Sequence, residues 1–545
     1  MCMSRAARRV PRPSSRASCA CRTRSPGRRS PCSVRQWPKP PEGPHRHVPV
    51  GGSCASDAYQ RLPCRGRGHA ATAKSNPRSG ARGRCALRPR RGRAARAAGP
   101  ALAWRRALAK ISPVSVLDQI QSCGVVGAGG AGFPTHVKLK AQADTIILNA
   151  AECEPLLHKD KELLRAYPEQ ILAGLETARG LVGAGSAVVG IKGKYHDVID
   201  VLAPKLPAKM RIQALSDSYP AGDEFILVYD VTRRIIPPGK IPLAVGCVVI
   251  NVETALNIAR GKPVIEKFLT VAGAVKSPAT VRVPVGTSFA EAIELAGGAN
   301  VPSPVVLVGG TMMGRYSDNL SEPITKTTGG LIVLGRDHPL VHRYTLPWKA
   351  IKTIGAAACD QCNFCTYFCP RWLLGHPIEP HRAMRSLGFN MVGQPNVIGT
   401  LFCCECNLCT MMACPEDLDP KNVCTTNKRQ LMSEGTKWAV EADPNRAALH
   451  LENRRVPIGR LIRKLGLSKF VNQGPLLSAD HKPAKVVLPL KQHAGAPAKA
   501  TVSVGDRVNA GDVIARPADG ALGAVIHASI NGRVTSVNES IVIEA

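Results

Sequence analysis

CDQCNFCTYFCP at residues 359–370 and CCECNLCTMMACP at residues 403–415 are the two stretches around which this chain is organised. Each spaces three cysteines two residues apart and adds a fourth cysteine, followed by proline, after three or four further residues. Three thiolates at this spacing cup one corner of a cubane iron–sulfur cluster. Zinc ribbons supply only two cysteines per knuckle. The pattern therefore predicts two [4Fe–4S] clusters rather than zinc sites.

The fourth cysteine of such a run ligates the other cluster in two-cluster ferredoxins. On that rule the predicted ligand sets are Cys359, Cys362, Cys365 and Cys414 for one cluster, and Cys403, Cys406, Cys409 and Cys369 for the other. The second run has one extra residue before Cys414, and we still expect this cysteine to ligate. Cys404 and Cys424 fall outside the pattern and are interpreted as packing residues or free thiols.

Half of the 20 cysteines lie between Cys359 and Cys424, which favours metal binding over a disulfide framework and implies a reducing cytoplasm. The longest apolar run, near Ala244–Val252, is far shorter than the roughly 18 residues needed to cross a bilayer. We therefore predict no transmembrane segment.

The formal net charge of +34 over 545 residues is concentrated in residues 1–110, where the only acids are Glu42 and Asp57. The rest of the chain is mildly basic, so we predict no nucleic-acid binding. Residues 1–110 are rich in Arg, Pro, Ser and Gly without helical or strand periodicity, and we predict a disordered extension. It could be a targeting peptide, a tail that binds polyanions, or a stretch that is not native to the protein; we favour the last.

The remaining chain predicts a multidomain α/β and α+β protein. Apolar runs such as Thr145–Leu148 alternate with helical stretches such as Lys159–Leu181, whereas the final residues read as short strands separated by turns. The predicted parts are an α/β domain at 113–262, a small α+β module at 265–340, the cysteine-rich module at 350–430, a basic linker at 431–484 and an all-β domain at 485–545.

A glycine loop, Gly127-x-Gly129-x-x-Gly132, opens the α/β domain. It satisfies the dinucleotide fingerprint by letter, but a helix rather than a strand is predicted before it, so alone it is a weak signal. The loop is followed by Lys138 and by short motifs that carry asparagines and carboxylates. Glycines let backbone N–H groups approach a phosphate, a lysine neutralises it, and carboxylates accept hydrogen bonds from sugar hydroxyls.

Together these motifs resemble the flavin-binding 51-kDa-type subunit of respiratory NADH dehydrogenases. Over 113–545 the chain is more similar to the RnfC component of the Rnf complex and to the cobalamin reductase of propanediol utilisation. The resemblance implies FMN at Gly127, Gly129, Gly130, Gly132, Lys138, Asn149, Glu152, Asn251 and Thr254. It implies the nicotinamide nucleotide, NADH, at Phe133, Glu154 and Glu224.

The flanking modules also resemble parts of this family. Residues 265–340 resemble the β-grasp-like SLBB module, which we take as a scaffold. Residues 485–545 resemble the barrel-sandwich fold of biotinyl and lipoyl carriers, but no lysine follows Lys499, so we expect an unmodified docking or packing domain. Its place at the end of the chain favours the reductase over the Rnf component. The basic stretch Ile458–Phe470 could dock a membrane or a partner, but internal docking is favoured because Pro457, Gly459 and Gly466 interrupt any helix there.

The resemblance implies an oxidoreductase that passes electrons from NADH through FMN and two clusters to cob(III)/cob(II)alamin. It further implies a bacterial microcompartment, with a corrinoid adenosyltransferase or a shell protein as partner. One alternative is an Rnf-type component, peripheral on the inner face of the membrane. Another is a non-catalytic electron wire, which stays open because Ala128 and Ala151 replace an Arg and an Asp of the respiratory protein.

Overall fold

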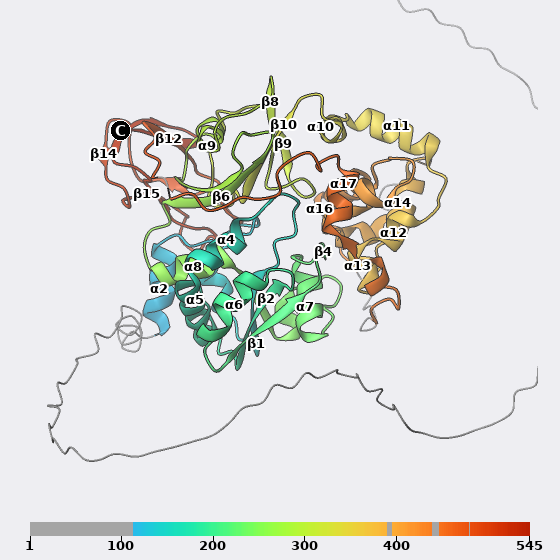
Figure 1. Ribbon diagram of the computed structural model, residues 1–545, viewed down its shortest axis with the longest axis horizontal. Coiled ribbons are helices and arrows are strands. Elements are labelled where there is room, and N and C mark those ends of the chain that lie inside the picture. Colours follow the sequence, from blue (N-terminus) through green and yellow to red (C-terminus); the bar gives the residue numbers. More distant parts are fainter. Residues whose placement is uncertain (1–112, 390–394, 439–445, 479) are drawn as a thin grey trace, which may run out of the picture. The chain divides into compact units, whose positions relative to one another are not determined.

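The structure is a computed structural model that describes residues 113–389, 395–438, 446–478 and 480–545 (Figure 1). The chain divides into two units, 1–93 and 94–545, and every described residue belongs to the second. The predicted disordered extension at 1–110 lies outside the described residues. Within the described ranges, no helix combines the length and the apolar character that crossing a bilayer requires.

A four-stranded parallel sheet with strand order β3-β2-β1-β5 forms the first domain. Three of its strands, β1, β2 and β5, are apolar and largely buried, as expected when helices cover both faces of a parallel sheet, whereas the edge strand β3 is buried only at its two ends. The four strands are β1 (Thr145–Ala150), β2 (Ser186–Lys192), β3 (Met210–Leu215) and β5 (Cys247–Asn251).

Helices pack on both faces of this sheet. On one face α5 (Pro168–Leu181) and α8 (Val252–Arg260) lie side by side over Ile146 and Leu148 (Figure 1). On the other face α7 (Glu224–Thr232) packs against Ile147. The predicted single helix over Lys159–Leu181 is two helices, because Pro168 lacks an amide hydrogen and begins a new one. The remaining helices are α2 (Pro113–Ser122), α3 (Thr135–Lys138), α4 (Lys159–Ala166), α6 (His196–Leu202) and the short turns η1 (Ala203–Lys205) and η2 (Pro242–Val245).

The strand order reverses at β1, because β2 and β3 lie on one side of it and β5 lies on the other. Asn149, near the end of β1, pairs in register with Asn251 at the end of β5. Ligands of open α/β sheets bind outside the carboxyl ends of the strands at such a reversal. The two asparagines therefore mark the edge where this fold is suited to hold a ligand.

The next module is a five-stranded sheet of order β7-β6-β10-β8-β9 packed against one helix, α9 (Phe289–Leu295). Ser288 and Glu291 form a capping box that fixes where α9 begins. Four strands of this module contain the β-branched runs Leu269–Val271, Thr280–Val283, Val305–Val308 and Leu331–Leu334, whereas the short strand β9 consists mostly of polar residues and has no apolar run. The strands are β6 (Glu266–Gly273), β7 (Ala279–Pro284), β8 (Pro304–Val308), β9 (Arg315–Ser317) and β10 (Gly330–Gly335).

The cysteine-rich module is helical, and both cysteine runs lie in loops and in the single-turn helices α12 and η4. Proline begins several of these helices, because its missing amide hydrogen costs nothing in the first turn. The helices and turns are α10 (Pro339–Thr345), α11 (Trp348–Ala358), α12 (Phe364–Tyr367), α13 (Pro370–Leu373), α14 (Pro380–Ser386), α15 (Pro395–Ile398), η3 (Gly399–Phe402), η4 (Cys409–Ala413) and α16 (Pro420–Ser433).

The described part of the predicted linker is packed on the rest of the second unit. After η5 (Glu452–Arg454), strand β11 (Val456–Pro457) pairs with β4 (Ser218–Tyr219) of the first domain. Arg455 donates to Asp230 at 2.9 Å, and Leu461 of α17 (Ile458–Lys464) is buried. These contacts favour the internal-docking interpretation of the basic stretch.

The C-terminal domain consists of two small antiparallel sheets that enclose one core. The sheet orders are β12-β18-β17-β14 and β13-β15-β16. The strands are β12 (Lys485–Pro489), β13 (Lys499–Ala500), β14 (Arg507–Val508), β15 (Val513–Arg516), β16 (Ile526–His527), β17 (Gly532–Val537) and β18 (Ser540–Glu544).

Lys326 joins three of these parts. Its side chain is buried, and its ammonium donates to the backbone oxygens of Gly124 at 2.9 Å and of Val525 at 2.8 Å. Both acceptors are neutral, so burial dominates and lowers the pKa of Lys326 to about 7. The first domain, the β-grasp-like module and the C-terminal domain therefore share one buried amine.

We expect Lys326→Met to flatten the pH dependence of stability. Between about pH 7 and pH 10.5 the unfolded chain binds a proton on Lys326 that the folded chain does not, so the free energy of unfolding rises with pH. The contribution approaches about 1.4 kcal/mol per pH unit. Denaturation of the wild type and the variant at pH 7 and pH 9 measures it, with the exposed Lys485→Met as control. Equal slopes in wild type and Lys326→Met would contradict the prediction.

Candidate functional site

The glycine loop is a tight turn closed by its own backbone. Gly127 N–H donates to the Phe133 oxygen at 2.9 Å, and Gly132 N–H donates to the Gly127 oxygen at 3.2 Å. Gly130 and Gly132 adopt φ of 117° and 65°, values that residues with a Cβ rarely reach. Gly129 and Gly130 are exposed, so the backbone at the tip is open to a ligand.

Two neighbouring modules support the rear of this loop. A Cβ on Gly132 would lie 2.8 Å from Thr327 of the β-grasp-like module and 3.1 Å from His493 of the C-terminal domain. Ala494 N–H donates to the Gly132 oxygen at 3.0 Å. Within the first domain, Ala128 N–H donates to Thr254 Oγ1 at 3.0 Å. The C-terminal domain, which the sequence predicts to dock or pack, therefore packs against the back of the glycine loop.

The predicted site asparagines lie beside the loop at the strand ends. Asn149 Nδ2 donates to the Gly222 oxygen at 2.8 Å. Asn251 caps α8 by accepting from Glu253 N–H at 2.9 Å, and its Nδ2 donates to Asp160 at 2.8 Å. A Cβ on Gly129 would meet the Asn251 side chain at an ordinary 3.5 Å, so loop tip and strand end are in contact range.

Lys138 and Glu224, predicted to contact FMN and the nicotinamide nucleotide respectively, are bonded to each other. Lys138 Nζ lies 3.2 Å from Glu224 Oε1 and donates to the Val249 oxygen at 3.0 Å. Both side chains are partly exposed, at 32% and 44%. Phe133 is also partly exposed. The structure therefore brings Lys138 and Glu224 together, and it leaves Phe133 partly exposed at the end of the glycine loop.

Glu154 has a different environment from the one the resemblance implies. Its carboxylate accepts from the backbone N–H groups of Thr311, Met312 and Met313 at 2.8, 2.9 and 2.8 Å. Burial raises its pKa to about 7, against the lowering by these donors. Both oxygens are engaged with the β-grasp-like module, so a nucleotide contact is not what this geometry provides.

Glu152 remains next to the strand end. It accepts from Glu154 N–H at 3.0 Å, and burial together with the charge of Asp160 raises its pKa.

Behind the loop lies a buried charge network that no sequence motif indicates. Glu253 Oε2 bonds both Lys159 at 2.9 Å and Lys267 at 2.6 Å, and Lys159 also pairs with Asp160 at 2.8 Å. Lys267 Nζ donates to the Ala128 oxygen at 3.4 Å. Lys267 belongs to β6, so the β-grasp-like module contacts the glycine loop from behind. Of these residues, only Glu253 lies in a stretch that the sequence marks, because it stands between the predicted FMN contacts Asn251 and Thr254.

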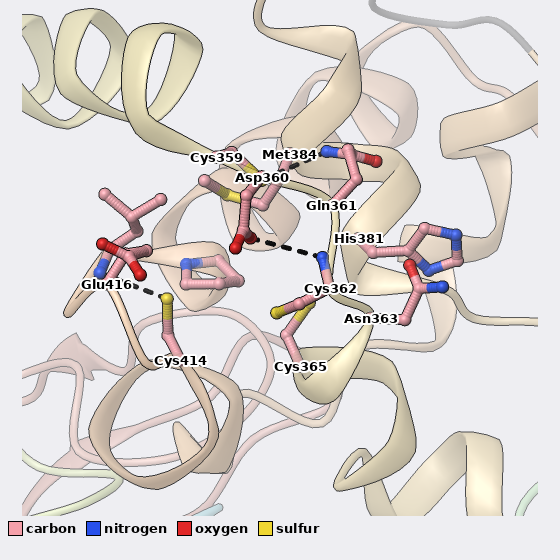
Figure 2. Close-up of a pocket in the computed structure, with 12 residues that line it drawn as sticks. Cys359, Asp360, Gln361, Cys362, Asn363, Cys365, His381, Met384, Cys414 and Glu416 are labelled. Carbon is pink, nitrogen blue, oxygen red and sulfur yellow. Dashed lines mark hydrogen bonds between the residues drawn. The ribbon is translucent and has the colours of Figure 1, made fainter.

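Four cysteines from both runs line one cavity (Figure 2). They are the members of the first predicted ligand set, Cys359, Cys362, Cys365 and Cys414. Cys362 is exposed, whereas burial raises the pKa of Cys365 to about 12. A thiol donor set that converges in this way from two runs fits one cubane cluster.

The other four cysteines form a second, more buried group. Cys369, Cys406 and Cys409 are buried, and Cys403 is partly exposed. Burial raises the pKa of Cys409, and so do the neighbouring thiols of Cys403, Cys369 and Cys365. Cys365 belongs to the first set, so the two sets are close enough to interact. Among the described residues, no three His, Cys, Asp or Glu side chains converge tightly enough to hold a single metal ion.

The two runs repeat one backbone geometry despite their different lengths. Residues flanking the second cysteine are left-handed in both, at φ of 61° and 67° for Gln361 and Asn363, and 60° and 67° for Glu405 and Asn407. The extra residue before Cys414 is absorbed by the π-helical turn η4, in which Cys414 N–H donates to the Cys409 oxygen at 3.2 Å. Cys369 and Cys414 consequently share nearly the same φ, at −70° and −71°.

Cys404 and Cys424 stand beside the predicted ligands. Cys424 is fully buried and packs with Cys403 and Cys414. Cys404 is partly exposed and packs in the core that contains Tyr219 and Cys406. Both placements agree with packing roles.

One segment, Tyr219–Glu224, connects the strand-end site to the second cysteine run. Tyr219 hydroxyl donates to the Cys406 oxygen at 2.8 Å. Asp223 caps α7 and accepts two hydrogen bonds from the guanidinium of Arg371, at 2.5 and 2.9 Å. Arg371 lies two residues after Cys369. Arg371 also lies 3.8 Å over the Phe225 ring. The same segment is held from the other side by Asn149 and Lys138.

Comparison with known families assigns each part. Residues 120–260 match the Nuo51 FMN-binding domain, and residues 268–316 match the SLBB domain. Residues 358–419 match the 4Fe-4S dicluster domain, and residues 468–545 match the RnfC barrel sandwich hybrid domain. The chain thus combines an FMN-binding domain, an iron–sulfur domain, an SLBB domain and a barrel sandwich.

Two curated relatives match more than three quarters of the chain, and a third matches about half of it. Cobalamin reductase PduS of Salmonella typhimurium is 43% identical over 79% of this chain and 96% of its own length. The Citrobacter freundii protein of the same name is 41% identical over 78% and 95%. A component of the Na(+)-translocating ferredoxin:NAD(+) oxidoreductase complex of Acetobacterium woodii is 32% identical over 47% and 58%. The chain therefore belongs to the PduS cobalamin reductase family.

Proposed function

We propose that this protein is a flavin and iron–sulfur oxidoreductase that passes electrons from NADH to the cobalt of a corrinoid. The observation that carries the proposal is the Tyr219–Glu224 segment, which contacts both the strand-end site and the second cysteine run. A two-electron donor site and one-electron carriers are useful together only when they adjoin. Membership of the PduS family supports the corrinoid as acceptor.

The residues around the glycine loop fit FMN. The open backbone at Gly129 and Gly130 suits a phosphate, which Lys138 would neutralise. Asn149, Glu152, Asn251 and Thr254 offer groups for the rest of the cofactor. When bound, the flavin accepts two electrons as a hydride and releases them singly.

For the nicotinamide nucleotide, Phe133 and Glu224 are the residues we retain from the resemblance. Glu224 must leave Lys138 if the lysine turns to a phosphate, which would free its carboxylate for a sugar hydroxyl. Glu154 instead anchors the loop at Thr311–Met313 beside this site.

In the cysteine module, Cys359, Cys362, Cys365 and Cys414 would hold one [4Fe–4S] cluster, and Cys369, Cys403, Cys406 and Cys409 the other. We further propose that the protein works in a bacterial microcompartment, beside a corrinoid adenosyltransferase or a shell protein. This placement stays a prediction from the resemblance to the cobalamin reductase of propanediol utilisation.

Anaerobic purification followed by flavin, iron and sulfide analysis tests the proposal, with NADH titration in the presence of hydroxocobalamin. Gly129→Ala is the sharpest variant. Its Cβ has only ordinary contacts with Asn251, so we expect unchanged stability but weaker FMN binding, because the methyl group blocks approach to the backbone. Gly180→Ala, in α5 with open space around its Cβ, is the matched control and should retain FMN.

The outcomes separate the alternatives. Flavin that is bleached by NADH without cobalt reduction would rule out the corrinoid as acceptor, and reduction of ferredoxin in its place would favour an Rnf-type activity. A purified protein that contains clusters but no flavin would leave the non-catalytic electron wire as the remaining alternative. Equal FMN affinity in Gly129→Ala and wild type would place the flavin elsewhere.

A further inference from the structure

The two cysteine runs repeat each other in sequence and backbone but lie in opposite surroundings. Cys362 and Phe364 of the first run correspond to Cys406 and Leu408 of the second. Cys362 and Phe364 are exposed, the latter by 43%, whereas Cys406 and Leu408 are 6% and 2% exposed. Local sequence does not explain this difference, because the loops have the same left-handed residues.

The second run is buried because it docks on the first domain and the SLBB domain. Tyr219 donates to the Cys406 oxygen at 2.8 Å, and Asn407 Nδ2 donates to the Met312 oxygen at 3.1 Å. Leu408 packs with Tyr219 and Met312 in one core. In the first run, the corresponding Asn363 lines the cavity of Figure 2, where the exposed Asp360 and Cys362 also lie.

The elements next to each cysteine set extend this contrast. Arg371, two residues after Cys369, makes the buried ion pair with Asp223, at the start of the helix that carries Glu224. The first set is bordered by Asp360, Phe364 and Glu416, all of them exposed. One set therefore adjoins the proposed flavin site, and the other adjoins solvent.

From this asymmetry we infer that electrons enter at the inner set, Cys369, Cys403, Cys406 and Cys409, and leave from the outer set, Cys359, Cys362, Cys365 and Cys414. The corrinoid meets the protein at the exposed loop 360–364. The inference rests on the proposed function and adds an order and an exit point to it. Each NADH oxidised to NAD+ releases one proton and two electrons, which leave singly and reduce two cob(III)alamin to two cob(II)alamin.

Rapid-freeze EPR after NADH addition to the anaerobic holoenzyme tests the order, with Cys406→Ser and Cys362→Ser as variants that alter one set each. In Cys406→Ser, we expect loss of NADH-driven formation of the outer-cluster signal, while dithionite still produces it. In Cys362→Ser, the inner-cluster signal should form at the wild-type rate while cobalt reduction is lost. The opposite pattern would overturn the inference.

Loop variants that leave every ligand in place test the exit point. Phe364→Ser should raise the KM for hydroxocobalamin several-fold and leave NADH-driven cluster signals unchanged. Met432→Ser is the matched control: Met432 is 62% exposed and lies 12 residues beyond the cavity-lining Pro420 on α16, about 18 Å along the helix. An unchanged KM in Phe364→Ser would overturn the exit at this loop.

Failure of the proposed function gives a distinct result. If NADH produces no cluster signal in the wild type, the donor assignment fails. Clusters reduced with dithionite and then mixed with hydroxocobalamin still report the exit: wild type and Met432→Ser should reoxidise faster than Phe364→Ser at limiting cobalamin. Equal reoxidation rates in all three would overturn the exit point independently of NADH.

Discussion

Glu253→Gln is expected to lower the free energy of unfolding by about 3–5 kcal/mol and to release bound FMN. Glu253 is 1% exposed and is the shared partner of Lys159 and Lys267, which are equally buried. A neutral amide leaves two buried ammonium groups with only Asp160 to balance them. Since Lys267 also contacts the Ala128 oxygen, the glycine loop should shift with the network. Chemical denaturation and flavin fluorescence measure the two effects.

The loss of unfolding free energy in Glu253→Gln should become smaller as the pH rises. In the wild type, burial lowers the pKa of Lys267 to about 8 despite the opposing charge of Glu253. Without that charge the pKa of Lys267 falls further, so at pH 6 the variant loses an ion pair that the wild type has. At pH 9 Lys267 is largely neutral in both folded proteins. The difference in unfolding free energy should therefore be larger at pH 6 than at pH 9.

Glu266→Gln is the matched control. Glu266 begins β6, next to Lys267, but its side chain is 40% exposed and its partners Arg260 and Arg282 lie 3.7 and 3.9 Å away. Exposed pairs contribute about 0–1 kcal/mol. A loss in Glu253→Gln no larger than in Glu266→Gln would contradict a structural role for the network.

Arg371→Met is also expected to lower the free energy of unfolding by about 3–5 kcal/mol, and to slow cluster reduction by NADH. The Arg371 and Asp223 side chains are 9% and 10% exposed, so the substitution leaves a buried carboxylate without its cation. It also removes the guanidinium stacked on Phe225. The cysteine-rich module and the Tyr219–Glu224 segment would then lose this ion pair between them. Denaturation and stopped-flow bleaching of cluster absorbance measure both effects.

A double variant separates stability from electron transfer. Adding Asp223→Asn to Arg371→Met removes the orphaned charge and should restore part of the unfolding free energy but not the bleaching rate. Arg382→Met, which breaks a half-exposed pair with Glu379 in the same module, should change neither. If NADH bleaches the cluster absorbance of Arg371→Met at the wild-type rate, the ion pair is not part of the path from the flavin site to the clusters.

Much of the fold was predictable because its signals are local. The strand that begins at Thr145 and the strands of the SLBB module follow from β-branched, apolar runs. The helical stretch Lys159–Leu181, which is divided into two helices, shows the limit of periodicity, because one residue, Pro168, interrupts a continuous helical pattern. The extra residue before Cys414 was visible in the sequence, but its accommodation by a π-helical turn was not.

The sequence by itself determined the chemistry: thiols at ferredoxin spacing, and glycines whose φ above zero only a residue without Cβ adopts readily. Tertiary structure decided which of these groups meet. It brought Lys267 from another module under the glycine loop and turned Glu154 to the loop at Thr311–Met313. It also buried one of two equivalent cysteine loops and exposed the other. Spacing is a property of neighbouring residues, whereas burial and pairing depend on contacts between residues that are distant in the chain, such as Lys267 and Ala128, 139 positions apart.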